Sequence, residues 1–369
     1  MILHGNCIEV MPKLEAESFH TCVTSPPYWG LRDYGLPPTY WPEVTYTPMP
    51  GLSSVTVPEW IGCLGLEPTP EMFTAHMVLV FREVWRLLLN DGTLWINFGD
   101  TYASGGKGGG GSYVAERRAW EGKDAVKGWR SPPEGLKHKD LVGIPWRIAF
   151  ALQADGWYLR MDNIWSKPNC MTESVQDRPT KAHEYIFLLS KSERYYYDRE
   201  AIKEPLAPAS VVRLSQDLEA QQGSNRGNGG VKTMKAVGGS PGAFGPPQSR
   251  KRSGNKERKH GESRDRPGSQ LGASIPWEGE TRNKRSVWNV ATSQFTEAHF
   301  ATFPEKLIEP CILAGAPVGG RVLDPFGGSG TTLKVALENN RECTIIEMGE
   351  QYVEIAKRRT AVVQPVLDI

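Results

Sequence analysis

Apolar residues follow two different periods along the chain, and these periods predict short strands separated by amphipathic helices. The predicted strands cover residues 2–3, 19–23, 93–98, 157–165, 185–189, 321–324 and 343–346. Between several of these strands, apolar positions repeat every three or four residues, which is typical of one buried helix face. This alternation predicts an α/β fold in which helices connect the strands of one sheet.

The clearest predicted helix follows Thr69-Pro70, a pair typical of a helix start, and we expect it to end at Asp91-Gly92. Because strands are predicted on both sides of it, this helix should be a crossover between two parallel strands. The apolar positions on its buried face are Phe73, Met77, Val80, Phe81, Val84, Trp85 and Leu88. The helix beginning near Pro145 and the strands at 157–165 and 185–189 predict two more crossover units.

Length and hydropathy predict one large domain with a substantial insertion. The chain has 369 residues, more than the ~100–200 of a usual domain. A hydrophobic content of 39% and a mean hydropathy of −0.43 are typical of globular proteins. No apolar run approaches the ~20 residues of a membrane helix, and the N-terminus resembles no secretory signal. We therefore expect a cytoplasmic protein without a membrane partner.

The six cysteines are scattered and form no Cys-x-x-Cys pair, so neither a zinc ribbon nor a disulfide framework is expected. We predict no metal site.

Positive charge is concentrated in one part of the chain. Residues 210–285 contain fifteen Lys or Arg and seven Asp or Glu, although the whole chain carries a net charge of +1. Glycine, serine and proline are frequent there and aliphatic residues are few. This segment is either a disordered basic linker or an insertion that neutralises DNA phosphates. We place the insertion at 206–287, between a first part at 1–205 and a last part at 288–369.

A segment that we call the Pro-Pro segment, residues 24–29 with the sequence TSPPYW, follows the predicted strand 19–23. Pro26 and Pro27 lack an N–H group and cannot continue a strand. The strand end therefore presents a hydroxyl, free backbone carbonyls and two aromatic rings. Such groups can accept hydrogen bonds from an amino group beside a planar ring.

The second informative stretch is the glycine loop, residues 324–332 with the sequence DPFGGSGTT. It lies between an apolar strand and a helix, and its glycines allow a ligand to approach the backbone closely. The next strand ends in Glu347, twenty positions after Gly327, the spacing expected for a carboxylate that binds ribose hydroxyls. A dinucleotide fingerprint starting at Gly327 would need glycine at Ser329 and Thr332, which disfavours NAD.

Together these stretches resemble the amino-group DNA methyltransferases that use S-adenosylmethionine. The Pro-Pro segment matches the catalytic signature of that family and the glycine loop matches its cofactor motif. The catalytic motif comes first, a basic region follows and the cofactor motif comes last, which resembles the β arrangement. The resemblance implies a doubly wound, circularly permuted Rossmann-like sheet with helices on both faces and the basic stretch as a target-recognition insertion.

The resemblance also implies the site residues. The catalytic residues would be Ser25, Pro26, Pro27 and Tyr28. The cofactor would contact Asp324, Pro325, Phe326, Gly327, Gly328, Ser329, Gly330, Thr331 and Glu347, with Thr302 and Phe303 beside its methionine end. DNA would contact Trp29 and the cluster Arg250, Lys251, Arg252, Lys256, Arg258 and Lys259.

The target base would be flipped out of duplex DNA and stacked on Tyr28. Its amino group would be held by the Ser25 hydroxyl and the Pro26 carbonyl. Ser25 in place of aspartate resembles the cytosine-N4 enzymes, so we predict N4-cytosine methylation, with adenine-N6 methylation as the alternative. A cognate restriction endonuclease is a candidate partner, and the enzyme would be a monomer or homodimer.

Four other interpretations fit the residues less well. The glycine-rich stretch at 104–112 does not fit the phosphate-loop pattern, because Gly108 follows Lys107. Cys311 follows a proline, as the nucleophile of cytosine-C5 enzymes does, but it lies in a helical pattern. A nicotinamide-dependent oxidoreductase would leave the Pro-Pro segment without a role. A non-catalytic DNA-binding protein would not explain the glycine loop.

Overall fold

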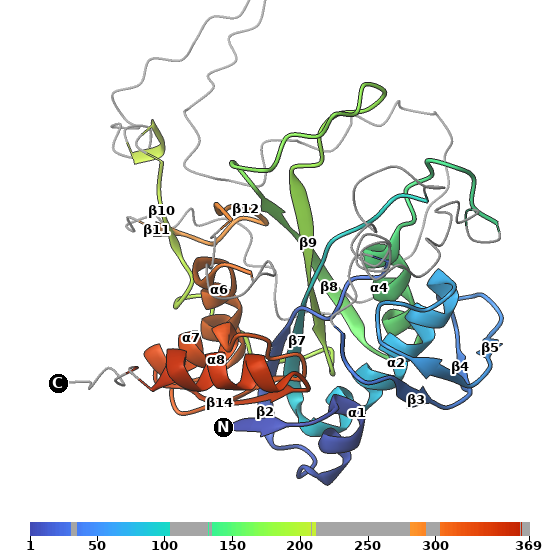
Figure 1. Ribbon diagram of the computed structural model, residues 1–369. Helices are drawn as coiled ribbons and strands as arrows, with labels where there is room; N and C mark the ends of the chain where they lie inside the picture. The colour runs from blue at the N-terminus through green and yellow to red at the C-terminus, as the bar shows by residue number, and fades with distance from the viewer. Residues whose placement is uncertain are drawn as a thin grey trace, which may run out of the picture. The chain divides into compact units, whose positions relative to one another are not determined.

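The architecture is a mixed sheet of eight strands covered by helices on both faces (Figure 1). The computed structural model describes residues 1–30, 35–103, 132, 135–207, 209–211, 281–292, 303–361 and 363. These divide into two compact units, one of residues 1–202 with 284–369 and one of residues 203–283. The larger unit contains the eight-stranded sheet.

The strands of this sheet lie in an order that differs from their order in the chain. From one edge to the other they are β1 (Ile2–His4), β14 (Glu342–Glu347), β13 (Arg321–Asp324), β2 (Phe19–Thr24), β7 (Leu88–Phe98), β9 (His183–Ser190), β8 (Tyr158–Ser166) and β12 (Val287–Asn289). Strands β13 and β14, from the end of the chain, pair with β2 and β1, from its beginning. This closure confirms the predicted permuted, doubly wound sheet.

All pairs in the sheet are parallel except the two that β9 makes with β7 and β8. The prediction of two further crossover units was therefore wrong for β9, which returns antiparallel to both neighbours. Helix α4 (Ile144–Ala154) does connect two parallel strands, β7 and β8, because both run antiparallel to the β9 strand between them. Apolar runs alone do not reveal strand direction, since a buried strand has the same composition in either orientation.

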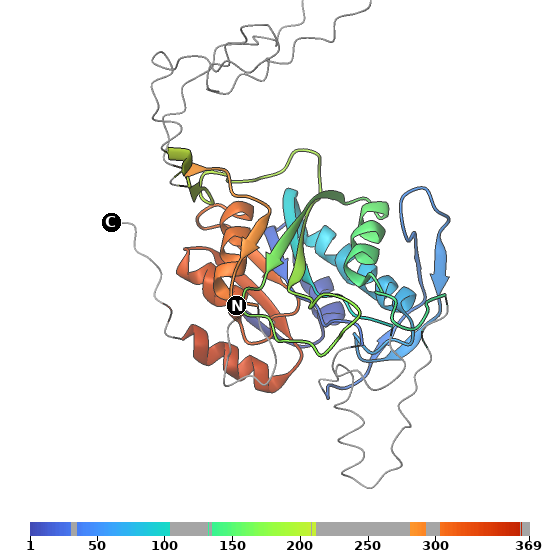
Figure 2. The same ribbon diagram turned by 90° about the horizontal axis from the view of Figure 1, so that it is seen from above.

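The helices pack in two groups on opposite faces of the sheet (Figures 1 and 2). Leu94 and Ile96 of β7 face the first group, whereas Trp95 faces the second, as the alternation of a strand requires. The first group is α1 (Cys7–Val10), the following 3-10 turn η1 (Met11–Lys13), α2 (Pro70–Leu87) and α4 (Ile144–Ala154). The second is α6 (Glu305–Gly315), α7 (Thr331–Glu338) and α8 (Glu350–Thr360).

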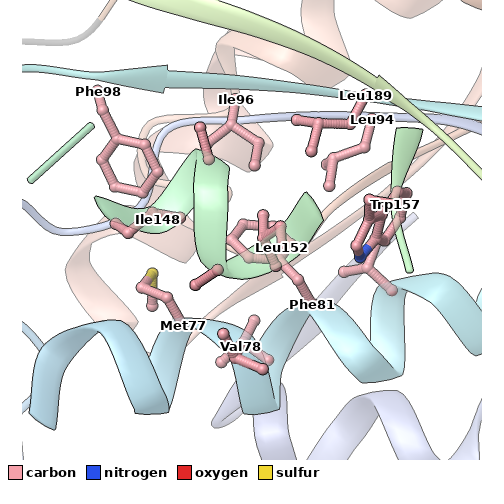
Figure 3. Close-up of a cluster of buried hydrophobic side chains, with 14 of the residues drawn as sticks. Met77, Val78, Phe81, Leu94, Ile96, Phe98, Ile148, Leu152, Trp157 and Leu189 are labelled. Carbon is pink, nitrogen blue, oxygen red and sulfur yellow. The ribbon is translucent and has the colours of Figure 1, made fainter. Parts of the chain in front are cut away.

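Helix α2 begins as its sequence predicts, with the Thr69 hydroxyl accepting from the N–H of Met72 at 3.2 Å and Pro70 in the first turn. Its apolar face packs with α4 on β7, where Phe81, Ile96 and Leu152 are buried (Figure 3). The helix ends at Leu87, earlier than predicted, and Asp91-Gly92 lies inside β7. The dipeptide lies where the register of β7 with β2 shifts, between the pairs Phe19–Leu88 and Thr21–Thr93.

Two small antiparallel sheets lie within the Pro- and Gly-rich stretch between β2 and α2. They are β3 (Thr39–Trp41) with β6 (Trp60–Gly62) and β4 (Val44–Tyr46) with β5 (Val55–Val57). The smaller unit, residues 203–283, contains β10 (Glu204–Pro205) paired with β11 (Thr281–Arg282), joined by an ion pair between Arg282 and Glu204. In the described ranges, no helix is long and apolar enough to span a membrane.

Candidate active site

A pocket of about 480 Å³ lies at the edge of the sheet where the parallel strands end, and both the Pro-Pro segment and the glycine loop line it. Parallel sheets of this kind bind ligands at that edge. The lining residues from the two segments are Ser25, Pro26, Pro27, Tyr28, Pro325, Phe326, Gly327, Gly328, Ser329 and Thr331. Stretches about 300 positions apart in sequence therefore contribute to one site.

The Tyr28 side chain is held by polar groups from two neighbouring strands. Its hydroxyl lies 3.0 Å from the Asn97 amide oxygen and 2.8 Å from Glu184 Oε2, so either atom can accept its proton. Asn97 also donates to Glu184 Oε2 at 3.2 Å. A Cβ atom at Gly99 would lie 2.7 Å from the Tyr28 ring, so the absence of a side chain at Gly99 leaves room for that ring. The tyrosine ring is therefore fixed at the wall of the pocket.

Trp29 does not line the pocket. Its indole N–H donates to the carbonyl of Glu67 at 2.9 Å, and its side chain is partly buried against the core. The following residue, Gly30, donates from its backbone to the carbonyl of Gly65 at 2.8 Å. These bonds anchor the chain as it leaves the Pro-Pro segment, so the described contacts of Trp29 are structural.

Glu347, at the end of β14, combines the features expected of a ribose-binding carboxylate. Its Oε2 accepts from the N–H of Gly328 at 2.8 Å and its Oε1 from the N–H of Gly349 at 2.7 Å. The residue lines the pocket. Burial raises the pKa of this carboxyl, although backbone hydrogen bonds from Gly349, Gly328 and Met348 oppose the shift.

Asp324 lies beneath the pocket and is not among its lining residues. It is 1% exposed, and its Oδ1 accepts from the Thr24 hydroxyl at 2.6 Å and the Phe326 N–H at 3.0 Å. Its Oδ2 accepts from the Thr332 hydroxyl at 2.7 Å. Burial raises the pKa of Asp324, while these donors lower it. The carboxylate thus holds the two segments together instead of facing a ligand.

The glycine loop is also supported from α8. Arg359 donates to the Ser329 carbonyl at 2.9 Å, the Ser329 hydroxyl at 2.7 Å and the Thr331 hydroxyl at 3.0 Å. The same guanidinium pairs with Glu305 at 3.1 Å. Gly330 has a φ of 79° and a Cβ there would lie 2.8 Å from Ala356, so a side chain would be both strained and obstructed.

Several predicted residues are placed by the structure and others fall outside its described part. Phe303 lines the pocket, whereas Thr302 and the cluster Arg250, Lys251, Arg252, Lys256, Arg258 and Lys259 are not among the described residues. Cys311 is fully buried in α6 and lines no part of the pocket, and burial raises the pKa of its thiol. Within the described ranges, no group of three or more metal-ligating side chains occurs.

The sequence interpretation missed pocket residues on three other strand ends: Asn97, Trp165, Lys167 and Glu184, together with Gly5, Asn6 and Cys7 after β1. Trp165 lies opposite Glu184 in the pairing of β8 with β9. The signal that could have found them is their position in the chain. They stand at or next to the ends of predicted strands, and these ends meet at the edge of the sheet where the pocket lies. Identifying Glu184, at the start of β9, required the antiparallel direction of that strand.

Comparison with known proteins identifies the class. A family model described as DNA methylase, covering the N6 and N4 methyltransferases, matches residues 19–358. The Type II methyltransferase M.SmaI of Serratia marcescens is 39% identical over 97% of this chain and 89% of its own length. M.Cfr9I of Citrobacter freundii is 38% identical over 97% of this chain and 86% of its own length.

Solved structures share the fold at low sequence identity. The cytosine-N4-specific PvuII DNA methyltransferase gives a TM-score of 0.53 at 16% identity, covering 97% of this chain and 85% of its own. The Thermus thermophilus protein TTHA0409, solved with S-adenosyl-L-methionine, gives 0.50 at 19% identity, with coverages of 99% and 94%. The chain belongs to the N6/N4 DNA methylase family, which is the class its sequence motifs predicted.

Proposed function

We propose that this DNA methyltransferase transfers a methyl group from S-adenosylmethionine to N4 of a cytosine flipped out of duplex DNA. The observation that carries the choice of base is Ser25, a neutral hydroxyl in the pocket wall next to the Pro26 carbonyl. Cytosine N4 is the more nucleophilic of the two candidate amino groups, and a neutral acceptor suits it. Adenine-N6 enzymes usually carry aspartate at this position.

The residues present fit the cofactor. Glu347 offers oxygens to the ribose hydroxyls, and the lining residues Phe326 and Ile346 are apolar enough to contact an adenine ring. Ser329 and Thr331 lie at the start of α7, where backbone N–H groups favour a carboxylate such as that of the methionine moiety. When bound, S-adenosylmethionine supplies the electrophilic methyl group of a sulfonium ion.

The catalytic contribution of the chain is to hold the amino nitrogen of the base. That nitrogen is a weak nucleophile because its lone pair is delocalised into the ring. Hydrogen bonds from its N–H groups to the Ser25 hydroxyl and the Pro26 carbonyl favour a pyramidal nitrogen pointing toward the cofactor end of the pocket. Tyr28, fixed by Asn97 and Glu184, offers the ring face on which the base stacks. Positioning and electrostatics then supply the rate enhancement.

The decisive experiment is methyl transfer from labelled S-adenosylmethionine to unmodified DNA, followed by mass spectrometry of the nucleosides. We expect N4-methylcytosine. Recovery of N6-methyladenine without N4-methylcytosine would assign the other base. Absence of labelled nucleosides, with a control methyltransferase active on the same DNA, would contradict the proposed activity.

We also propose that the basic insertion, 206–287, neutralises DNA phosphates. The excess of positive charge in 210–285 supports this, since phosphate contacts release counterions and make affinity depend on salt. Neutral substitution of the cluster between Arg250 and Lys259 should weaken DNA binding and flatten the plot of log affinity against log salt. An unchanged slope would instead identify the segment as a linker.

The Type II class of the two methyltransferase relatives supports a role in a restriction–modification system. A restriction endonuclease with the same recognition site is therefore a proposed partner. The cytoplasm, where chromosomal DNA is found in bacteria, is the proposed location.

A further inference from the structure

Lys167 occupies a position in the pocket wall that the transfer of a methyl group by itself does not explain. It follows β8 directly, and its side chain is 18% exposed. Of the described residues that line the pocket, Lys167 alone carries a positive charge. A partly buried ammonium needs a compensating interaction, and the structure supplies one in the carboxylate of Glu184.

The position of this ammonium is fixed by the sheet. The backbone N–H of Lys167 donates to the carbonyl of Ala182 at 2.8 Å, which extends the pairing of β8 with β9. Its Nζ lies 4.2 Å from the centre of the Trp165 ring, a cation–π contact, and donates to Glu184 Oε1. The other oxygen of Glu184 accepts from Asn97 and lies 2.8 Å from the Tyr28 hydroxyl.

The carboxylate of Glu184 therefore connects two functions. Through Oε2 it positions the ring of Tyr28, on which the base is proposed to stack, and through Oε1 it holds the ammonium of Lys167. An ammonium has three N–H donors, and in the described part of the chain Glu184 is the one acceptor that the Lys167 ammonium reaches. The remaining N–H groups of the Lys167 ammonium can therefore point into the pocket.

The hydrogen-bonding edge of the target base has the complementary pattern. Beside its N4 amino group, cytosine carries N3 and O2, which both accept hydrogen bonds. The Ser25 hydroxyl and Pro26 carbonyl supply acceptors for the amino group but no donor for these ring atoms. Thymine and guanine have an N–H in place of the ring acceptor, and that N–H would face a cation. A flipped base is read through such contacts to its edge.

We propose that Lys167 is a specificity-determining residue that donates a hydrogen bond to a ring acceptor of the flipped base, and that Glu184 holds it there. This inference rests on the proposed methylation of a flipped base. It assigns to the end of β8 a role in reading the base, separate from the holding of the amino group by the Pro-Pro segment.

The test compares Lys167→Met, which keeps the length of the side chain and removes its charge, with Lys167→Arg, which keeps donors. Lys191→Met is the matched control, because Lys191 is also partly buried and lies near a carboxylate, 3.7 Å from Glu17. Lys191 bonds to the carbonyl of Leu88, the first residue of β7, away from the pocket. Thermal unfolding of each variant measures any loss of stability separately.

Binding is measured with S-adenosylhomocysteine and two duplexes that carry the site methylated by the wild type, one with the target base and one abasic there. We expect Lys167→Met to bind the target duplex at least about tenfold more weakly and the abasic duplex as the wild type does. Lys167→Arg should recover part of the loss, and Lys191→Met should bind both duplexes normally. A parallel loss in kcat/KM is expected for Lys167→Met.

Equal weakening on both duplexes would overturn the inference, because it would indicate a phosphate contact or a general structural role. No weakening on either duplex would overturn it too. Both results differ from failure of the proposed function, in which the wild type itself forms no N4-methylcytosine. If the wild type methylates adenine, the same comparison with adenine at the target still decides the role of Lys167, because adenine N1 is an acceptor beside N6.

Discussion

The hydroxyl of Thr24 donates to the carboxylate of Asp324 at 2.6 Å, and this buried hydrogen bond joins the Pro-Pro segment to the glycine loop. Thr24 is the last residue of β2 and directly precedes Ser25, whereas Asp324 ends the adjacent strand β13. Because both side chains are 1% exposed, the distance between the two halves of the site is set by a contact shielded from water.

Replacing Thr24 by valine should therefore change catalysis as well as stability. The change removes one donor from the buried Asp324 carboxylate and should cost about 1–3 kcal/mol in free energy of unfolding. The rate of methyl transfer should fall by more than the loss of folding stability explains, because Ser25 and the glycine loop lose their common anchor. The matched control is Thr21→Val, also buried in β2, whose hydroxyl bonds to Thr93 away from the pocket. Equal kcat values for the two variants would contradict this interpretation.

Cofactor affinity should depend on pH through Glu347. Burial raises the pKa of this carboxyl in the folded protein, so protonation begins at a higher pH than for an exposed glutamate. The protonated form accepts fewer hydrogen bonds, and the Kd for S-adenosylmethionine should therefore rise as pH falls through that raised pKa. Calorimetric titrations at several pH values measure this dependence.

Glu347→Gln should weaken binding about tenfold at neutral pH and remove the pH dependence. The exposed Glu350, three positions further on, provides the control, since Glu350→Gln should leave both the affinity and its pH profile unchanged. A pH profile that persists in Glu347→Gln would assign the titration to another group.

Removing only the hydroxyl of Tyr28 should reduce activity, because that hydroxyl fixes the ring through Asn97 and Glu184. We expect Tyr28→Phe to lower kcat/KM for DNA about tenfold and to leave cofactor affinity unchanged. Tyr28→Ala should lower kcat/KM for DNA further, since stacking of a base on an aromatic ring contributes ~1–3 kcal/mol. Steady-state kinetics with varied DNA measures both effects.

The control for this change is Tyr40→Phe. The hydroxyl of Tyr40 also donates to a carboxylate, that of Glu59 at 2.7 Å, but on the small sheet of β3 and β6, and Tyr40 does not line the pocket. Full activity of Tyr28→Phe would show that the ring needs no anchoring through its hydroxyl.

Arg359 should matter for the cofactor although it lies on α8 and lines no part of the pocket. Its guanidinium holds Ser329 and Thr331 through three hydrogen bonds, so Arg359→Met should raise the Kd for S-adenosylmethionine about tenfold or more. Arg359→Lys should recover only part of the affinity, because an ammonium cannot reproduce the planar geometry of the donors.

Lys357, which forms an exposed pair with Glu354 on the same helix, serves as the comparison for Arg359. Lys357→Met should bind the cofactor normally, since exposed pairs contribute little. Similar affinities of Arg359→Met and Lys357→Met would show that the glycine loop keeps its shape without the arginine.

The sequence by itself indicated the family, the α/β class and the two segments that line the pocket, and the permuted sheet followed from the family resemblance. It could do so because prolines and glycines restrict the backbone locally and their spacing is visible in the chain. It also placed Glu347 at the end of its strand by spacing alone. These are local properties, and distant contacts did not alter them.

Only the tertiary structure decided which residues share the pocket and which lie beneath it. Asp324 belongs to the predicted cofactor motif but is buried, because the neighbouring strand β2 brings Thr24 to its carboxylate and helix α7 brings Thr332. Lys167 and Glu184 meet because β9 runs antiparallel to β8, a direction that an apolar run does not specify. Strand direction and pairing arise from contacts between distant segments, and these contacts determine which side chains face the pocket.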